Sequence, residues 1–533
     1  MRVPEAIGRD QAPLVRGMYA GGSSFRPSRP TAANLIKIKV NRILSPALTG
    51  FVPASARVQM PLPDETIVAI ATAPGRGGIG VVRVSGCRAR EVAMPMLRMP
   101  QQLQAGRAQF GYLLDVSKEL GDERSVVLDE VVVTYFAGPR SYTGEDVVEV
   151  AAHGSPVVLD AILRGALTGG ARLAEPGEFT ERAFLSGRLD LTQAEAVNDL
   201  IRSTTLHQAR VAAGHMGGAV SHEVLPTKQR LVRLIATLEA GIDFAEDDID
   251  VLPRVEILER LSDVTAPLAK LERSYAYGRV VRDGFRLAIA GRPNAGKSSL
   301  FNALVERERS IVTAVAGTTR DWVTETISIE GVPVELMDTA GLREAEGGSL
   351  DEAERLGIAR SREAMADADV VLLVIDGTDA PHAEDLAILE ARGDKNMDGG
   401  GCRLLVALSK SDLFRDRAAN APVTAISEQV RVMETSTRDG TGIAEMRIAI
   451  LDAMRGEGGT REGGLLTNLR QHQAIKDSLG ALRDARVAAE VGLPHEVLLM
   501  DLHRGLRGLD DLTGTTTSED ILRQIFSNFC IGK

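Results

Sequence analysis

The segment RLAIAGRPNAGKS, residues 286–298, decides the fold of the central part of the chain. Its apolar start predicts a buried strand, its end (Gly291–Ser298) matches the pattern G-x-x-x-x-G-K-[ST] of a phosphate-binding loop (P-loop), and the helix-compatible SLFNAL follows. In such a loop backbone N–H groups surround phosphate oxygens, Lys297 would reach the β- and γ-phosphates, and Ser298 would bind Mg²⁺. The order of these elements predicts a nucleotide-binding domain built on a parallel sheet.

Two downstream segments have the order and spacing of the switch loops of a GTPase. DTAG (Asp338–Gly341) follows the apolar run VPVELM, which places Asp338 to hold Mg²⁺ through water and Gly341 to contact the γ-phosphate. Before it, GTTRD (Gly317–Asp321) carries a threonine that can close over Mg²⁺ when the γ-phosphate is present.

A third segment, SKSD (Ser409–Asp412), selects the base. Asp412 can accept hydrogen bonds from N1–H and from the amino group of guanine, a pairing that adenine cannot offer. The GTPase pattern has Asn where this chain has Ser409, and the shorter side chain could weaken the affinity without removing the preference for guanine. The segment TST around Ser436 is a weaker match for the last guanine loop. The predicted nucleotide is GTP.

These segments leave the activation of water open. Ras-like enzymes place a Gln directly after the DTAG glycine, whereas this chain has Leu342, which has no hydrogen-bonding group. No arginine finger can be identified. Asn294 in the P-loop offers a carbonyl near the phosphates, where a monovalent cation could replace the charge of an arginine; alternatively, Asn294 is an ordinary filler of the loop.

The remaining segments predict a multidomain α/β and α protein. Paired β-rich runs in TIVAIATAPGRGGIGVVRVSG and DEVVVTYFAGPRSYTGEDVVEVAAHG, followed by the helical period of SPVVLDAILRGAL, indicate a small α+β domain. Long amphipathic helical patterns flank the α/β segment, which we interpret as an insertion into a helical domain. The predicted boundaries are 1–61 for an N-terminal extension, 62–186 for the α+β domain, 187–280 and 457–533 for the two helical parts, and 281–456 for the inserted domain.

Composition limits the remaining possibilities. The net charge of −11 argues against a broad basic face that holds nucleic acid by phosphate neutralisation alone. The strongest apolar run, DVVLLVID, has the length of a strand, so no membrane span is expected. The first 60 residues carry nine Lys or Arg against two acidic residues, and we favour a disordered extension or a mistaken start over a mitochondrial transit peptide.

Beyond these features, the chain resembles the MnmE (TrmE) family of tRNA-modification GTPases from about Asp64 to Lys533. The resemblance is carried by PGRGGIGVVRVSG, SYTGEDVVEV, PGEFTERAFLSGRLDLTQAEA, AGRPNAGKSSL, AGTTRD, DTAGLRE and the terminal FCIGK. It implies an N-terminal α+β domain that binds 5-formyl-tetrahydrofolate or a related one-carbon folate and helps to form a homodimer. It also implies a helical domain interrupted by an inserted Ras-like P-loop GTPase domain, and K⁺-dependent association of the two GTPase domains of the dimer during hydrolysis.

The resemblance further implies a reaction and a partner. With an FAD-containing flavoprotein (MnmG, also called GidA), such a protein adds a carboxymethylaminomethyl-type group at C5 of the wobble uridine of certain tRNAs. The implied location is the bacterial cytoplasm, or mitochondria if the basic extension is a transit peptide.

Site residues follow from the matching motifs. The implied folate contacts are Arg83, Glu149, Arg188 (where the family often has Lys) and Lys533. The implied K⁺ ligands are Asn294, Thr313, Val315 and Thr318, and those of Mg²⁺ are Ser298 and Thr319. The predicted GTP-binding residues are Asn294, Ala295, Gly296, Lys297, Ser298, Ser299, Thr313, Ala314, Val315, Ala316, Gly317, Thr318, Thr319, Asp338, Thr339, Ala340, Gly341, Ser409, Lys410 and Asp412.

Glu354 and Lys297 are the implied catalytic residues of GTP hydrolysis. The water-orienting glutamate of the family precedes Arg-hydrophobic-Gly, which selects Glu354 in ERLGI; the preceding loop looks longer than usual, so Glu352 competes.

Cys530 in the terminal CIGK is the candidate for the modification step. Three scattered cysteines do not form a disulfide framework, and Lys533 excludes a prenylation signal. By residue type a free cysteine is most often a small buried hydrophobe. We instead expect the apolar run ILRQIFSNF to dock a tail near the folate site, where Cys530 acts as nucleophile or proton donor without a part in GTP hydrolysis.

Two other functions use the same motifs. One is a pure GTP switch of the ribosome-assembly type, and the other is a folate-dependent enzyme that carries the GTPase domain as a regulatory insertion and needs no tRNA.

Overall fold

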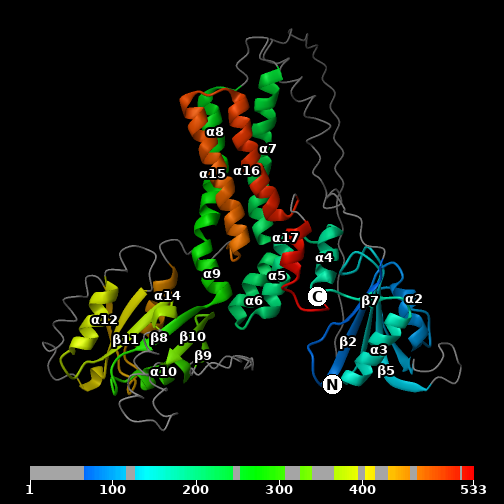
Figure 1. Cartoon of the computed structure of the whole chain (residues 1–533), viewed down its shortest axis with the longest axis horizontal. Helices are drawn as coiled ribbons and strands as arrows, with labels where there is room; N and C mark the ends of the chain where they lie inside the picture. The colour runs from blue at the N-terminus through cyan, green and yellow to red at the C-terminus, as the bar shows by residue number, and fades with distance from the viewer. Residues whose placement is uncertain are drawn as a thin grey trace, which may run out of the picture. The chain divides into compact units, whose positions relative to one another are not determined.

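The computed structural model describes residues 65–115, 126–243, 252–306, 324–338, 365–393, 403–413, 430–455, 465–515 and 519–532. A seven-stranded sheet, a set of helices, a six-stranded sheet and a second set of helices follow one another along the chain (Figure 1). The predicted N-terminal extension, residues 1–61, lies outside the described residues.

The first sheet has the strand order β3-β4-β5-β6-β2-β1-β7. Its strands are β1 (Ile67–Ile70), β2 (Gly77–Ser85), β3 (Leu97–Arg98), β4 (Ala108–Leu114), β5 (Val127–Phe136), β6 (Val147–Gly154) and β7 (Arg172–Leu173). Helices α2 (Ala89–Ala93) and α3 (Pro156–Thr168), with the 3₁₀ helix η2 (Met94–Met96), pack against one face. The predicted strand pairs are confirmed: β1 pairs with β2 and β5 with β6, and both pairs are antiparallel.

Strand β2 already begins at Gly77, within the Gly-rich segment GRGG that follows β1. Gly77 pairs with Gly154, where a Cβ would lie 2.5 Å from the Gly77 carbonyl oxygen. Glycine therefore permits a close strand pairing here as well as a turn.

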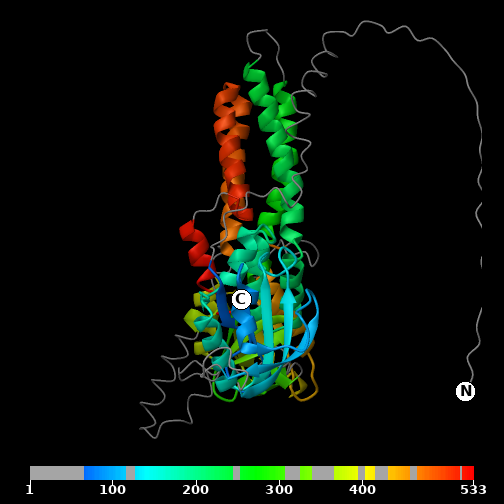
Figure 2. The same cartoon turned by 90° about the vertical axis from the view of Figure 1, so that its right-hand side faces the viewer.

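Four long helices form an antiparallel bundle: α7 (Ala219–Asp243), α8 (Arg254–Arg273), α15 (Leu469–Val491) and α16 (His495–Thr513). They lie side by side in Figures 1 and 2 and bury leucine-rich stripes such as Leu231, Leu234 and Leu238 of α7. The shorter helices are α4 (Glu178–Leu185), α5 (Leu191–Arg202), α6 (Leu206–Met216), α9 (Tyr275–Asp283) and α17 (Glu519–Phe526).

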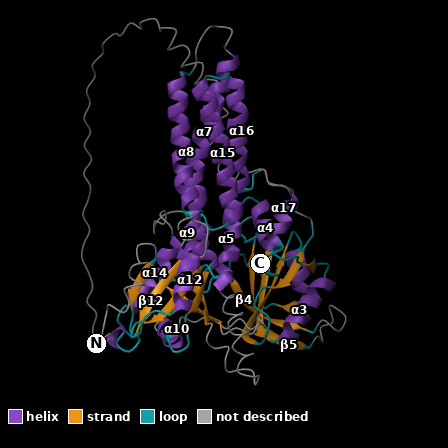
Figure 3. Cartoon of the chain, turned by 60° about the vertical axis from the view of Figure 1, so that its left-hand side comes forward, coloured by secondary structure: helices purple, strands orange, loops and turns teal. Residues whose placement is uncertain are grey.

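The second sheet has the order β13-β12-β11-β8-β10-β9 and is parallel except for β9. Its strands are β8 (Phe285–Ala290), β9 (Thr324–Ile329), β10 (Val332–Asp338), β11 (Val370–Asp376), β12 (Arg403–Ser409) and β13 (Arg431–Glu434). Helices α10 (Lys297–Glu306) and α14 (Ile443–Arg455) contribute to the core on one face, and α12 (Ala383–Gly393) contributes on the other. Coverage on both faces explains why β11 is an uninterrupted apolar run (Figure 3).

The chain enters and leaves this second sheet at neighbouring points. Ser274, just before α9, accepts a hydrogen bond at its Oγ from the backbone N–H of Leu466, at 3.1 Å. Gly278 of α9 faces the carbonyl of the same Leu466. The two ends of the segment that carries the sheet therefore lie side by side on α9, as an inserted domain requires.

Candidate functional site

The P-loop is a strained turn between β8 and α10. Gly291 (φ +139°) and Gly296 (φ +98°) have left-handed backbones, and so does Asn294 (φ +61°), a residue type that tolerates this conformation. A side chain at Gly291 would collide with the carbonyl of Val374 in β11. The sequence pattern is therefore required by the path of the backbone.

Lys297 begins α10, and its side chain is buried over the loop. Its Nζ donates a hydrogen bond to the carbonyl of Arg292 at 2.8 Å, whereas Ser298 and Ser299 are exposed in the first turn of the helix. Asp385 of α12 is buried nearby; burial raises the pKa of its carboxyl, and the charges of Arg292 and Lys297 oppose that rise. Arg292, Lys297 and the N-terminus of α10 therefore place positive charge at the P-loop.

The segment predicted to bind guanine contacts the P-loop through Ser409, the residue that departs from the GTPase pattern. Its Oγ lies 2.5 Å from the carbonyl oxygen of Ala295 and 3.2 Å from that of Ile375, and the side chain is buried. A Cβ on Gly296 would lie 3.4 Å from Ser409. The hydroxyl thus connects β12 to the P-loop, which the sequence did not reveal.

The other residues that we predict to bind guanine also lie together. Lys410 pairs with Asp376 at 2.6 Å; burial alone would raise the pKa of Asp376, but hydrogen bonds from Lys410 and Thr378 lower it. The Oγ of Ser436 donates to Asp412 Oδ1 at 2.9 Å, so the two segments predicted to read guanine are adjacent. Ser436, in the segment TST, therefore holds the Asp412 carboxylate in place.

The backbone of Asp338 ends β10 and is paired in register with Ile289 of β8, the strand that leads into the P-loop. Several predicted residues lie outside the described residues: Thr313, Ala314, Val315, Ala316, Gly317, Thr318, Thr319, Thr339, Ala340, Gly341, Glu352, Glu354 and Lys533.

A second group of predicted residues lies on the first sheet. Arg83 of β2 and Glu149 of β6 are register partners, and Arg83 Nε donates to Glu149 Oε1 at 2.8 Å. The Arg83 guanidinium lies 5.4 Å from the ring centroid of Tyr142 and 5.5 Å from that of Phe179, within the range of cation–π contact. Arg188 donates to the carbonyl of Ser141, next to Tyr142. The structure therefore brings the predicted Arg83 and Glu149 together and places Arg188 on the adjoining loop.

The C-terminal tail reaches the same group. Phe526 and Phe529 are buried in a cluster with Leu191, Ala194 and Val197 of α5. Gly532 is buried, and its carbonyl lies 3.5 Å from Arg83 Nη1. Between these anchors Cys530 is exposed. Residue type alone predicts a buried cysteine, and this prediction is wrong. Phe529 and Gly532 hold the backbone on either side, and the Cys530 side chain between them is exposed.

The sequence did not indicate the buried ion network that supports this group. Arg182 of α4, 1% exposed, bonds both Glu145 and Glu178 at 2.8 to 3.1 Å. Glu145 lies three residues after Tyr142, so the network holds the loop that carries this ring. SYTGED and PGEFTERAF contain these residues, but their separation in the chain conceals the contact.

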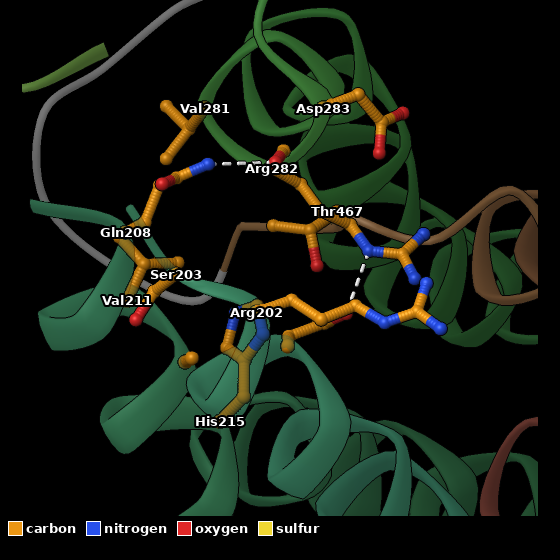
Figure 4. A pocket seen from close by; sticks show the side chains of 11 residues that line it. Arg202, Ser203, Gln208, Val211, His215, Val281, Arg282, Asp283 and Thr467 are labelled. Carbon is orange, nitrogen blue, oxygen red and sulfur yellow. Dashed lines mark hydrogen bonds and ion pairs between the residues drawn. The ribbon is translucent and has the colours of Figure 1, made fainter. Parts of the chain in front are cut away.

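A cavity of about 100 Å³ lies between α5, α6, α9 and Thr467 (Figure 4). Asp199, Arg202, His215 and Arg282 line it, and none of the predicted site residues does. Burial lowers the pKa of His215 and raises that of Asp199, although the charge of Arg282 opposes the rise. The cavity is therefore a feature separate from both predicted sites.

Within the described ranges, no helix is long and apolar enough to cross a membrane. The same ranges contain no group of three His, Cys, Asp or Glu side chains placed to hold a metal.

Comparison with known proteins gives the family. Residues 66–188 match the family described as GTP-binding protein TrmE N-terminus, and residues 191–530 match the MnmE helical domain. The tRNA modification GTPase MnmE of Koribacter versatilis is 56% identical over 474 residues, covering 88% of this chain and 99% of that protein. Proteins of the same name from Pseudomonas syringae pv. tomato (89% of this chain, 100% of that protein) and Alkaliphilus oremlandii (88% and 99%) are 41% and 38% identical.

A solved structure of an Era variant from Aquifex aeolicus bound to GDP·AlF₄⁻ is 25% identical, with a TM-score of 0.25, over 37% of this chain and 66% of that chain. The two matched domains, together with relatives aligned over almost their whole length, show that the chain belongs to the MnmE (TrmE) family.

Proposed function

We propose that the protein is a GTPase that acts in the modification of tRNA, with its GTP site and its modification site on different elements. The main support for a GTP site is the contact of Ser409 with Ala295, combined with the hydrogen bond from Ser436 to Asp412. These contacts bring the P-loop and both guanine segments to one place. The names of the relatives support the action on tRNA.

In the GTP site the chain supplies backbone donors and a lysine. The N–H groups at the start of α10 would bind phosphate oxygens, and Lys297 would leave the Arg292 carbonyl to bind the β- and γ-phosphates. The exposed Ser298 hydroxyl fits a Mg²⁺ ligand, and the exposed Asn294 in the same loop fits a K⁺ ligand. Bound Mg²⁺ and K⁺ would supply the positive charge that offsets the developing charge of the phosphoryl group.

We further propose that Glu354 orients the attacking water, because Leu342 cannot do so. Glu354→Ala should lower kcat strongly and leave nucleotide affinity nearly unchanged, as expected when an interaction of the transition state is removed. Glu352→Ala is the matched control. If the control has the large effect and Glu354→Ala does not, the roles are reversed.

The salt dependence of GTP hydrolysis tests the proposed K⁺ site. Hydrolysis should be much faster in K⁺ than in Na⁺ at equal ionic strength, and Asn294→Ala should remove the difference. Equal rates of the wild-type protein in the two salts would refute the proposed K⁺ site.

The modification site is proposed at Arg83, Glu149 and the C-terminal tail. The Glu149 carboxylate can accept hydrogen bonds from an aminopyrimidine edge, and the rings of Tyr142 and Phe179 border the neighbouring Arg83. This set of donors, acceptors and rings fits a folate, which would supply a one-carbon unit. Cys530 is exposed beside the group, where its thiol could act on a substrate.

The open face of the first sheet supports a homodimer. Phe110 and Val132 are register partners on the face opposite α2 and α3, and they are 48% and 43% exposed. An apolar pair on an open sheet face is a candidate subunit contact. We propose that this face pairs with a second copy and that an FAD-containing flavoprotein completes the tRNA-modifying complex.

One experiment tests the function as a whole. Bulk tRNA from a strain that lacks the gene should lack the C5-modified wobble uridine, and a plasmid copy should restore it. Unaltered wobble uridines would favour the pure GTP switch or the folate enzyme that needs no tRNA.

A further inference from the structure

Helix α5 contacts the root of the second sheet. Its Asp199 pairs with Arg282 of α9 at 2.8 Å; the Asp199 side chain is mostly buried and that of Arg282 is half-buried. Helix α9 ends at Asp283, and β8, the strand that leads into the P-loop, begins two residues later at Phe285. A displacement of the P-loop strand along its axis would therefore act on α5 through a short and nearly continuous connection.

The corner between α5 and α6 has two more contacts with the same part of the chain. Gln208 Nε2 donates to the carbonyl of Arg282 at 2.8 Å, and Thr205 Oγ1 lies 2.5 Å from the carbonyl oxygen of Gly331. Gly331 connects β9 to β10, and β10 ends at Asp338 of the DTAG segment. The corner thus contacts the strands that precede both the P-loop and the second switch.

The other contacts of α5 are with the tail. Arg202, the last residue of the helix, donates from Nη2 to the carbonyl of Asn528 at 2.7 Å. Leu191, Ala194 and Val197 pack with Phe526 and Phe529. Cys530 is two residues beyond the bonded carbonyl.

The helix between these contacts is suited to move as one body. Asp190 and Gln193 form a complete capping box at its N-terminus, and its twelve residues contain neither Gly nor Pro. The cavity between α5, α6 and α9 leaves space on the side of the Asp199–Arg282 pair (Figure 4). A small displacement of α9 can therefore occur without compressing a filled core.

We propose that Arg202 is a positioning residue for the Cys530 tail, and that α5 makes the position of this tail depend on the nucleotide bound at the P-loop. The role in tRNA modification rests on the proposed function of Cys530, whereas the dependence on nucleotide does not.

The test measures the alkylation rate of Cys530 in the full-length protein by mass spectrometry of the tryptic peptide 524–533. Iodoacetamide is applied in K⁺ buffer with either GDP or GDP and aluminium fluoride. We expect the Cys530 rate to differ between these states, and the rate of the exposed Cys87 in the same sample to be equal in both. Equal rates of Cys530 in the two states would overturn the coupling.

Variants of Arg202 test the positioning. Loss of a charged hydrogen bond should shift the docking equilibrium of the tail by about tenfold, so Arg202→Ala should lower tRNA modification by about that factor and remove the nucleotide dependence of Cys530 labelling. Arg202→Lys keeps a donor and should restore part of both effects, while GTP hydrolysis stays unchanged in all variants.

Arg164→Ala is the matched control, because Arg164 is an exposed arginine that pairs with Asp160 of its own helix. Full modification and nucleotide-dependent labelling in Arg202→Ala would overturn the role of Arg202. If Cys530→Ser modifies tRNA normally, the proposed function of Cys530 fails, and the labelling experiment still decides whether the tail follows the nucleotide.

Discussion

Gly532→Ala should displace the tail while leaving the GTPase intact. Gly532 has φ +92°, and a Cβ there would lie 2.5 Å from the carbonyl oxygen of Ile70 and 3.0 Å from Cα of Ala71. Both neighbours are backbone atoms, one at the end of β1 and one directly after it, so they cannot rotate away as a side chain could. Ordinary contact begins at 3.4 Å, which means that the tail must move by about an ångström. Such a shift breaks the 3.5 Å approach of Arg83 to the Gly532 carbonyl.

The size of the effect follows from this displacement. A misplacement of about 1 Å near a reacting group can cost on the order of 100-fold in rate. We therefore expect tRNA modification by Gly532→Ala to fall by about 100-fold, measured by nucleoside analysis of tRNA from a complemented deletion strain. The rate of GTP hydrolysis should not change, because the altered residue contacts β1 and Arg83 and none of the P-loop residues.

Gly170→Ala separates the collision from backbone strain. Gly170 has φ +95°, close to that of Gly532, but the nearest atom to its Cβ would be the flexible end of Arg88 at 3.4 Å. Both substitutions carry a left-handed strain of about 1–2 kcal/mol, and only one carries the collision. If Gly170→Ala loses modification equally, or if Gly532→Ala keeps it, the tail does not need the observed position.

Three further predictions concern the supporting contacts. Arg182→Met should destabilise the first sheet by about 3–5 kcal/mol, because it leaves the carboxylates of Glu145 and Glu178 buried without their guanidinium partner. Amide hydrogen exchange of β1 and β2 in the full chain should become faster, and unchanged protection would contradict this prediction. Burial would raise the pKa of Glu178, but hydrogen bonds, led by that from Arg172, lower it below 4.5 in the folded protein. The contribution of Glu178 to the free energy of unfolding should therefore be complete above about pH 4.5 and should disappear as the pH falls through the pKa of the folded state. Thermal unfolding from about pH 6 to about pH 3 measures this loss, which Glu178→Gln should abolish. Ser409→Ala removes the hydroxyl that bonds Ala295 and should weaken GDP binding about fivefold by calorimetry, whereas an unchanged Kd would show that this contact does not support the loop.

Local patterns were sufficient to predict β1, β2, β5 and β6 of the first sheet and β8, β10, β11 and β12 of the second, but not the remaining strands. DVVLLVID is β11, which is buried on both faces, and RLAIAGRPNAGKS is a strand, a turn and the start of α10, as its glycines and lysine indicate. Each of these predictions depends on residues within one element and its neighbours. The apolar run ILRQIFSNF begins within α17, and its residues Phe526 and Phe529 dock against α5, as expected.

Contacts between distant residues were not predictable in the same way. The pairing of Arg83 with Glu149 depends on β2 lying next to β6, and the approach of Gly532 to Ile70 joins residues near the two ends of the described chain. The exposure of Cys530 follows from that approach and from Phe529, so it could not be derived from the preference of cysteine for the interior. The bond from Ser409 to the P-loop was not predicted, for a different reason. Comparison with the GTPase pattern showed only that the usual Asn side chain is missing, and not which group the Ser409 hydroxyl contacts.

The separation of the two halves of the bundle has a consequence for synthesis. Helices α7 and α8 leave the ribosome before the segment that carries the second sheet, and their partners α15 and α16 follow roughly 200 residues after α8 ends. At about 5–20 residues per second, the leucine-rich faces of the first pair are without those partners for about 10–40 s. During this interval the nascent chain presents an apolar surface that chaperones can bind, and the inserted sheet, whose strands are consecutive in the chain, can fold first. The bundle can close only after the second sheet has been synthesised, when Leu466 contacts Ser274 and α15 packs against α8.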